Sequence, residues 1–362
     1  MSSTATTAHA SDAAAQRLRD WLTSGAVQWP SGAHAGGIVG ALDADGRARY
    51  VYPELTGYSL HWLAEAAPVA GTDVVRGPAR AAAAWAERVL ADGGVPATRA
   101  YLGDEPDDDW RNRAVFFFDL AMLLRGLCAA AEAGLVDAPA IAVGRLVDEL
   151  TRFVDADGRI VAARRLDADA QLPRRWSTLG GPFEVKATSR VVLAARHRPL
   201  PEALEHACRR HAADHVAGAG AVAIDMLHPT LYFAEGMLVA EPGSRTGIAA
   251  LLARLLAFQR ADGSLPEAED SDVPRSDVIA QALRVGLLLR ADDIDGAPDD
   301  AALDRLAAAL IARVRADGTL PFRPDVPAPQ PNAWCAMFAE QALRWHALAR
   351  RGLPLPHAEG LV

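Results

Sequence analysis

Three stretches of the chain carry polar side chains at the spacing i, i+4, i+7 within otherwise apolar sequence. They are Glu54–Tyr58–His61, His228–Tyr232–Glu235 and Asp277–Gln281–Arg284. Residues at this spacing lie on one face of a helix. A buried polar group without a partner costs roughly 2–7 kcal/mol, so three such stripes in apolar helices need a reason. The stripes predict either a site for acid–base chemistry or hydrogen-bonded networks that serve the structure, and the pattern leaves both interpretations open.

Proton transfer needs a donor and an acceptor whose pKa values burial or neighbouring charges move toward neutrality. The stretch from 228 to 235 combines an imidazole, a phenol and a carboxylate on one face, and it is the strongest single candidate. The predicted catalytic residues are His228, Tyr232, Glu235, Tyr58, Glu54 and Asp277. Asp119, within "FFFDLAML", is a further carboxylate whose pKa burial would raise.

Lys186 is the only lysine of the chain and lies just after a Gly-Gly-Pro turn, where an apolar helical pattern begins. A GC-rich genome would explain why lysines are rare, but not why this one is kept at such a junction. Arginine and lysine side chains at loop–helix junctions suit a carboxylate or phosphate group, and aromatic side chains there can stack on sugars. The predicted substrate-binding residues are Lys186, Glu184, Arg190, Arg275, Arg113, His61, Trp176, Gln281 and Trp334.

A short sequence pattern recurs along the chain and marks the helices that must position these residues. An apolar helical run, the dipeptide Asp-Gly and a polar loop follow one another, with the aspartates at Asp45, Asp92, Asp157, Asp262 and Asp317. If one copy of the pattern has been lost between 218 and 230, the chain consists of six repeated units of two helices each. The helices before the loops are predicted near 12–24, 75–91, 139–154, 201–217, 246–260 and 299–315. Those after the loops are predicted near 54–66, 112–132, 184–196, 229–240, 275–291 and 332–349.

The first set is amphipathic, which indicates one face toward water, whereas the second set is apolar all round, which indicates burial. The sequence therefore predicts an all-α protein: a single (α/α)6 toroid of six inner and six outer helices. The expected domain spans 12–350, with a flexible N-terminus at 1–11 and a C-terminal tail at 351–362. Parallel inner helices would bring six positively polarised N-termini to one mouth, which favours an anionic ligand.

Composition excludes several classes of function. The formal net charge is −9 and no basic tract occurs, which argues against a nucleic-acid partner. No apolar run is long enough for a membrane span and no signal peptide is visible, so we expect a cytoplasmic protein. The pair His211 and His215 has a spacing that can bind zinc, but it lacks a third ligand nearby. We expect no metal and no cofactor, since phosphate- and dinucleotide-binding glycine motifs are absent.

Several segments resemble those of a known superfamily. "LLAFQRADGSL" resembles the Gln-x-x-Asp-Gly-Ser repeat of terpenoid cyclases, and "HPTLYFAEGML" and "NAWCAMFAEQALRW" resemble bacterial toroid proteins of polysaccharide biosynthesis. The resemblance to the α/α-toroid superfamily covers nearly the whole chain and implies the architecture. The Asp-x-Asp-Asp and Asp-Asp-x-x-Asp motifs of the cyclases are absent. Toroids of sugar epimerases, unsaturated-uronide hydrolases and polysaccharide lyases are similar in architecture, so the resemblance implies carbohydrate chemistry.

The leading hypothesis is an enzyme that acts on a sugar-derived, anionic small molecule in polysaccharide or secondary-metabolite biosynthesis. Its chemistry would be acid–base proton transfer, as in an epimerase, isomerase or lyase. Three alternatives remain open: a terpenoid-cyclase-like enzyme with an apolar substrate, a glycoside hydrolase with a carboxylate pair, and a non-catalytic binding scaffold.

Overall fold

A computed structural model describes residues 3–40, 42–43, 46–102, 109–167, 171–326 and 330–362. The chain forms two compact units: unit 1 comprises Met1–Leu22 and Asp214–Val362, and unit 2 comprises Thr23–Ala213. The α-helices of the described residues are α1 (Ser3–Thr23), α2 (Pro53–Ala70), α3 (Thr72–Leu90), α4 (Phe117–Glu132), α5 (Ala140–Thr151), α6 (Trp176–Leu179), α7 (Val185–Ala194), α8 (Glu202–Ala213), α9 (Leu227–Ala240), α10 (Arg245–Leu256), α11 (Ser276–Ala291), α12 (Asp300–Ile311) and α13 (Ala333–Arg350).

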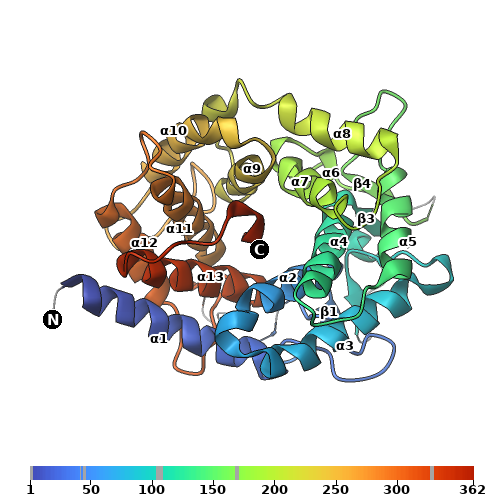
Figure 1. The fold of residues 1–362 in the computed structure, drawn as a ribbon, viewed down its shortest axis with the longest axis horizontal. Helices are drawn as coiled ribbons and strands as arrows, with labels where there is room; N and C mark the ends of the chain where they lie inside the picture. The colour runs from blue at the N-terminus through green and yellow to red at the C-terminus, as the bar shows by residue number, and fades with distance from the viewer. Residues whose placement is uncertain (1–2, 41, 44–45, 103–108, 168–170, 327–329) are drawn as a thin grey trace. The chain divides into compact units, whose positions relative to one another are not determined.

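Unit 1 consists of two layers of helices. Helix α11 lies between α9 and α13, while α10 packs on α9 and α11, and α12 packs on α11 and α13 (Figure 1). Every residue of α11 from Ser276 to Leu289 is buried, whereas α10 and α12 bury one face each. Helix α1 contacts α13 through Arg19, whose guanidinium lies 3.4 Å from Glu340. The predicted contrast between apolar and amphipathic helices is therefore confirmed in this unit.

Unit 2 repeats this arrangement. Helix α4 lies between α2 and α7, while α3 and α5 pack on α2 and α4, and α8 packs on α7. Residues Phe117–Ala130 of α4 are all buried, as the apolar run in the sequence predicts. Each of the twelve predicted helices has a counterpart in one of the two units.

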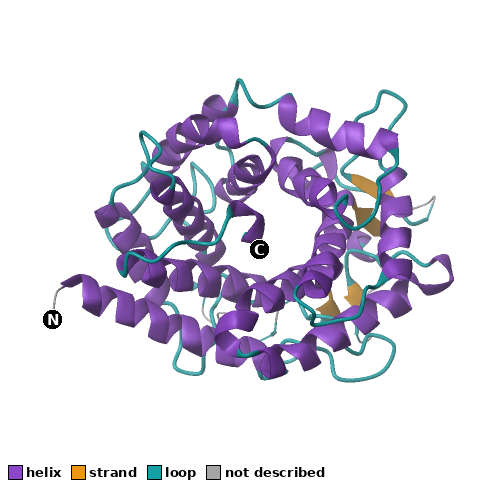
Figure 2. Cartoon of the chain, in the orientation of Figure 1, coloured by secondary structure: helices purple, strands orange, loops and turns teal. Residues whose placement is uncertain are grey.

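The short strands of the described residues all belong to unit 2 (Figure 2). Strand β1 (Tyr50–Val51) pairs antiparallel with β2 (Ala100–Tyr101), and β3 (Ala114–Phe116) pairs antiparallel with β4 (Ala163–Arg165). The prediction of a single helix over residues 112–132 is wrong for the residues before Phe117, where α4 begins. Residues 114–116 leave the helical pattern because they form a buried strand ahead of α4.

The Asp-Gly dipeptides of the repeat lie in tight turns wherever they fall within the described residues. In two of these turns the aspartate carboxylate accepts a hydrogen bond from the main-chain N–H of the residue two positions later. Asp262 accepts from Ser264 (2.9 Å), and Asp317 accepts from Thr319 (3.0 Å). Gly318 has φ +82°, and a Cβ there would overlap the main-chain oxygen of Arg17 in α1. Glycine is therefore required both by the backbone angle and by the close approach of the outer helix. Asp45 lies outside the described residues.

Both ends of the chain depart from the boundaries drawn on the sequence. The first helix begins at Ser3 rather than near residue 12. The segment after α13 ends with Leu361 and Val362 fully buried in unit 1. The division at 1–11, 12–350 and 351–362 stays a prediction. Among the described residues, no helix is both long enough and apolar enough to cross a membrane.

Candidate functional site

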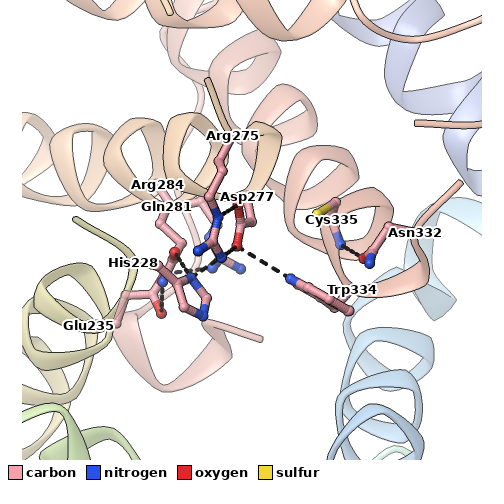
Figure 3. Close-up of polar contacts among 9 residues, drawn as sticks. All are labelled: His228, Glu235, Arg275, Asp277, Gln281, Arg284, Asn332, Trp334 and Cys335. Atoms are coloured by element: carbon pink, nitrogen blue, oxygen red, sulfur yellow. Dashed lines mark hydrogen bonds and ion pairs between the residues drawn. The ribbon is translucent and has the colours of Figure 1, made fainter. Parts of the chain in front are cut away.

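In unit 1, three adjacent buried helices each place a polar residue at their second position. These residues are His228 of α9, Asp277 of α11 and Trp334 of α13. The Asp277 carboxylate receives all the donors of this cluster. Arg275 binds both of its oxygens (3.1 and 2.5 Å), His228 Nδ1 lies 3.0 Å from Oδ2, and Trp334 Nε1 lies 3.4 Å from the same oxygen (Figure 3).

Loops tie the starts of these helices together. The main-chain N–H of Leu227, at the start of α9, donates to Glu267 in the loop before α11 (3.0 Å). The N–H of Ser276, at the start of α11, donates to Phe322 in the loop before α13 (3.2 Å). Asn332 caps α13 by accepting from the N–H of Cys335 (3.0 Å). An orphan donor at the start of α9 and another at the start of α11 thus hold the loop before the next buried helix, which keeps the three polar side chains together.

The charges of the cluster are balanced. Burial alone would raise the pKa of Asp277, but Arg275 and then His228 hold that pKa well below its usual value. The same carboxylate keeps the pKa of Arg275 above its ordinary value, although burial opposes this. Asp277 is therefore an ionised acceptor, and Arg275 neutralises it.

His228 has one ring nitrogen engaged and the other turned away from the cluster. Besides Asp277, its Nδ1 faces Oε1 of Gln281 at 2.7 Å. Both neighbours are acceptors, so Nδ1 carries a proton and the lone pair of the neutral ring lies on Nε2. In Figure 3 this second nitrogen points away from the residues drawn, and no described residue bonds to it. The Tyr232 ring packs on the imidazole with 4.2 Å between centroids.

The rest of the two stripes in this unit forms an ion pair deeper along the helices. Glu235 and Arg284 are both fully buried and lie 2.5 Å apart. Arg284 also donates to Gln341 Oε1 of α13 (2.9 Å) and to the main-chain oxygen of Val362 (3.0 Å). The predicted catalytic role of Glu235 is not tested by this arrangement, but its carboxylate is occupied by arginine.

Unit 2 carries a different group of polar residues at its helix starts. Glu54 lies in the first turn of α2, Asp119 in the first turn of α4, and Glu184 directly before α7. All three carboxylates are buried, with exposed fractions of 9 %, 4 % and 2 %. Neither oxygen of Glu184 has a hydrogen-bond partner among the described residues.

Burial and a neighbouring carboxylate act on two of these carboxyl groups. Burial, followed by the charge of Glu54, raises the pKa of Asp119 well above its ordinary value. The same two causes, in the same order, raise the pKa of Glu184. Like charges that share a buried site cannot all ionise at neutral pH. In this group, which we call the carboxylate cluster of unit 2, burial and the nearby carboxylate therefore favour the protonated forms of Asp119 and Glu184.

Lys186 is fully buried beside this cluster, and its ammonium lies 4.9 Å from the centroid of the Tyr58 ring. His61 and Arg190 are buried on the same pair of helices, α2 and α7. The predicted residues Glu54, Glu184, Lys186, His61 and Arg190 are thus all buried in unit 2, and their roles stay predictions.

Two predicted residues lie apart from both groups. Arg113 is exposed, and its guanidinium approaches Asp167 at 4.0 Å. Trp176 packs edge-on against Phe183, with 5.0 Å between ring centroids. Gln341 and Arg344 of α13 are buried and polar but are not among the predicted site residues. Polar residues within an apolar helical run could have indicated them, but the predicted stripes all begin near helix starts.

A cavity of about 730 Å³ lies at the other end of the buried helices of unit 1. Its wall includes the last turns of α11 and α13 and residues 352–358. Its arginines are paired: Arg245 with Asp292 (2.6 Å), and Arg350 with Asp300 (2.8 Å). Within the described part of the chain, no group of three His, Cys, Asp or Glu residues is arranged to hold a metal ion.

Comparison with known proteins defines the class of fold. No protein-family model matches the chain, and no curated protein sequence matches it either. Solved structures do match over nearly the full length, and the chain has the (α/α)6 toroid fold of these enzymes.

The individual matches are all distant in sequence. An unsaturated glucuronyl hydrolase specific for heparin is 12% identical with a TM-score of 0.69, covering 95% of this chain and 98% of that one. A D-mannose isomerase is 12% identical with a TM-score of 0.70, covering 94% and 97%. Cellobiose 2-epimerase from Bacillus thermoamylovorans is 10% identical with a TM-score of 0.67, covering 92% and 99%. These similarities give no support to the likeness to terpenoid cyclases.

Proposed function

We propose that this protein is an enzyme that acts on a sugar or sugar derivative by acid–base proton transfer, of the epimerase, isomerase or lyase type. One observation carries the proposal. His228 has its Nδ1 fixed between Asp277 and Gln281, while Nε2 points away from the cluster (Figure 3). An imidazole held by a carboxylate in this way is a base of defined tautomer and direction.

The chemistry balances without an oxidant or a reductant. His228 Nε2 accepts the proton from a carbon next to a carbonyl, and the electrons of the broken C–H bond form the enolate. Return of a proton to the other face of that carbon gives the epimer. If the proton instead returns to the former carbonyl carbon, the hydroxyl of the first carbon passes its proton to the former carbonyl oxygen, and the isomer results. Asp277 stabilises the imidazolium that exists between the two steps. The similarity in fold to sugar epimerases and to a D-mannose isomerase supports this class of reaction.

The structure bears less directly on the anionic character of the substrate. Arg275, predicted to bind an anion, is committed to Asp277 through two hydrogen bonds. An anionic substrate and a role in polysaccharide or secondary-metabolite biosynthesis therefore stay predictions, as does a cytoplasmic location. A small-molecule sugar is the partner that the proposal requires.

Solvent exchange tests the proposal. The protein in D₂O is incubated with mannose, glucose, cellobiose, N-acetylated hexosamines and uronic acids, and proton NMR follows loss of the signal next to the carbonyl. We expect exchange or isomerisation on at least one sugar, and we expect it to be abolished in His228→Gln. His206→Gln is the matched control, because His206 is exposed on α8. Exchange that survives unchanged in His228→Gln would refute the role of this imidazole.

The carboxylate cluster of unit 2 favours a second candidate function, glycoside hydrolysis. A buried carboxyl that keeps its proton near neutrality is the general acid that cleavage of a glycosidic bond needs. Glu184 and Asp119 both have raised pKa values. Release of reducing ends from unsaturated uronides or aryl glycosides, lost in Glu184→Gln and kept in His228→Gln, would favour the hydrolase over the epimerase.

A further inference from the structure

We propose that Gln281, Glu235, Arg284 and the buried segment 360–362 form a positioning relay that orients His228. The inference rests on the proposed function only in calling His228 the base. The relay itself is a set of contacts within unit 1 and can be tested without a substrate.

The first link is the amide of Gln281. Its Oε1 lies 2.7 Å from Nδ1 of His228, and its Nε2 donates to Glu235 Oε2 at 3.5 Å. An ionised carboxylate can only accept, so Glu235 turns the NH₂ group of the amide toward itself. The amide oxygen then faces the imidazole. A reversed amide would instead present a donor to the protonated Nδ1, and the two hydrogens would repel.

The second link is the ion pair of Glu235 with Arg284. Both side chains are fully buried, 2.5 Å apart (Figure 3). A buried ion pair contributes little to stability compared with apolar residues of similar size. Its presence beneath His228 is therefore better explained by the geometry that it imposes. The guanidinium also lies over the Phe338 ring at 4.1 Å, which fixes the plane of the fork.

The third link is the segment after α13. Arg284 Nη1 donates to Gln341 Oε1 (2.9 Å) and to the main-chain oxygen of Val362 (3.0 Å). Gln341 in turn donates to the oxygen of Gly360 (2.7 Å) and accepts from the N–H of Val362 (3.2 Å). Gln341 thus fastens the segment to α13, and the segment supplies one of the acceptors around Arg284.

Together these contacts explain the two stripes of unit 1. The spacing of seven residues between His228 and Glu235 matches the spacing between Asp277 and Arg284 on the neighbouring helix. His228 thereby meets Asp277, and Glu235 meets Arg284. Gln281 contacts both His228 and Glu235. Glu235, Arg284 and Gln341 are positioning residues, since they act on the base through Gln281.

The test is a spectroscopic signature of His228 in the full-length protein. With ¹⁵N-labelled histidine, proton–nitrogen correlation spectra report which ring nitrogen is protonated and how fast its hydrogen exchanges with water; His228→Gln assigns the signal. For the wild type we expect a protonated Nδ1 with slow exchange. In Arg284→Met we expect exchange to accelerate about tenfold, the factor for one net hydrogen bond.

Arg344→Met is the matched control. Arg344 belongs to another buried ion pair of unit 1, at 3.1 Å from Glu340, and no described contact joins it to the relay. Its loss should leave the His228 signal unchanged. If Arg284→Met does not fold, Gln341→Leu decides instead, because it loosens the segment while keeping the ion pair.

Equal His228 exchange in the relay variant and in Arg344→Met would overturn the proposal, as would a wild-type ring protonated on Nε2. Failure of the proposed function alone would look different. No sugar would then be turned over, while the His228 signal would still respond to Arg284→Met.

Discussion

Glu184→Gln should stabilise the protein at neutral pH. Glu184 is 2 % exposed, and neither of its oxygens has a hydrogen-bond partner among the described residues. Its charge is opposed by burial first and by Glu54 second, and both raise its pKa. Replacing the carboxyl with a neutral amide of the same shape removes that opposition.

The sign of the pH dependence follows from linkage. The unfolded chain releases the Glu184 proton near pH 4.3, as an exposed glutamate does, whereas the folded protein retains the proton to higher pH. The folded state therefore binds more protons above that point, and wild-type stability falls as the pH rises. The glutamine variant lacks this loss. The two proteins should be equally stable at pH 4, and the advantage of the variant should grow toward neutrality.

The magnitude follows from the buried charge: each unit by which the folded-state pKa exceeds the unfolded one is worth about 1.4 kcal/mol at a pH above both values. Urea unfolding followed by circular dichroism at pH 4, 5.5 and 7.5 measures it. Glu205→Gln is the control: Glu205 lies on α8 and pairs with Arg209 at 2.7 Å, so its loss should change stability by less than about 0.5 kcal/mol. A Glu184→Gln protein that is less stable than wild type at pH 7.5 would refute the reasoning about the carboxylate cluster.

Two further variants test the frame around the candidate sites. Asp277→Ala leaves the buried guanidinium of Arg275 without its carboxylate and should cost about 3–5 kcal/mol, read from urea unfolding; the double variant with Arg275→Met should recover most of this loss. Gly318→Ala introduces a Cβ at φ +82° against the main-chain oxygen of Arg17 and should cost about 2–4 kcal/mol. Faster hydrogen exchange confined to α1 in that variant would show that this helix is the element displaced.

Periodicity made the helices of this protein predictable. The apolar run of α4 and the polar faces of α10 and α12 could be predicted because burial determines how apolar residues are spaced along a helix. The strand at 114–116 was missed because three apolar residues continue a helical pattern as readily as they form a strand.

The candidate site was predictable in its members but not in their pairing. Spacing fixes which face of a helix a residue occupies, so His228 and Asp277 were found. Spacing along one helix does not predict which residue of the next helix will face a given side chain. The sequence therefore assigned Arg275 to a ligand, although the structure gives it to Asp277, and it could not foresee that Arg284 meets the oxygen of Val362.

The discontinuity of unit 1 has a consequence for how the chain is made. Helix α1 is synthesised long before its partners in α13: Ser11 bonds to His346, 335 residues away. The entropy of closing so long a loop is largest while the intervening chain is unfolded. Residues 23–213 have no such delay, since unit 2 is one continuous stretch. Unit 2 can therefore fold during synthesis and shorten the loop, while the buried face of α1 stays uncovered until α13 has been made.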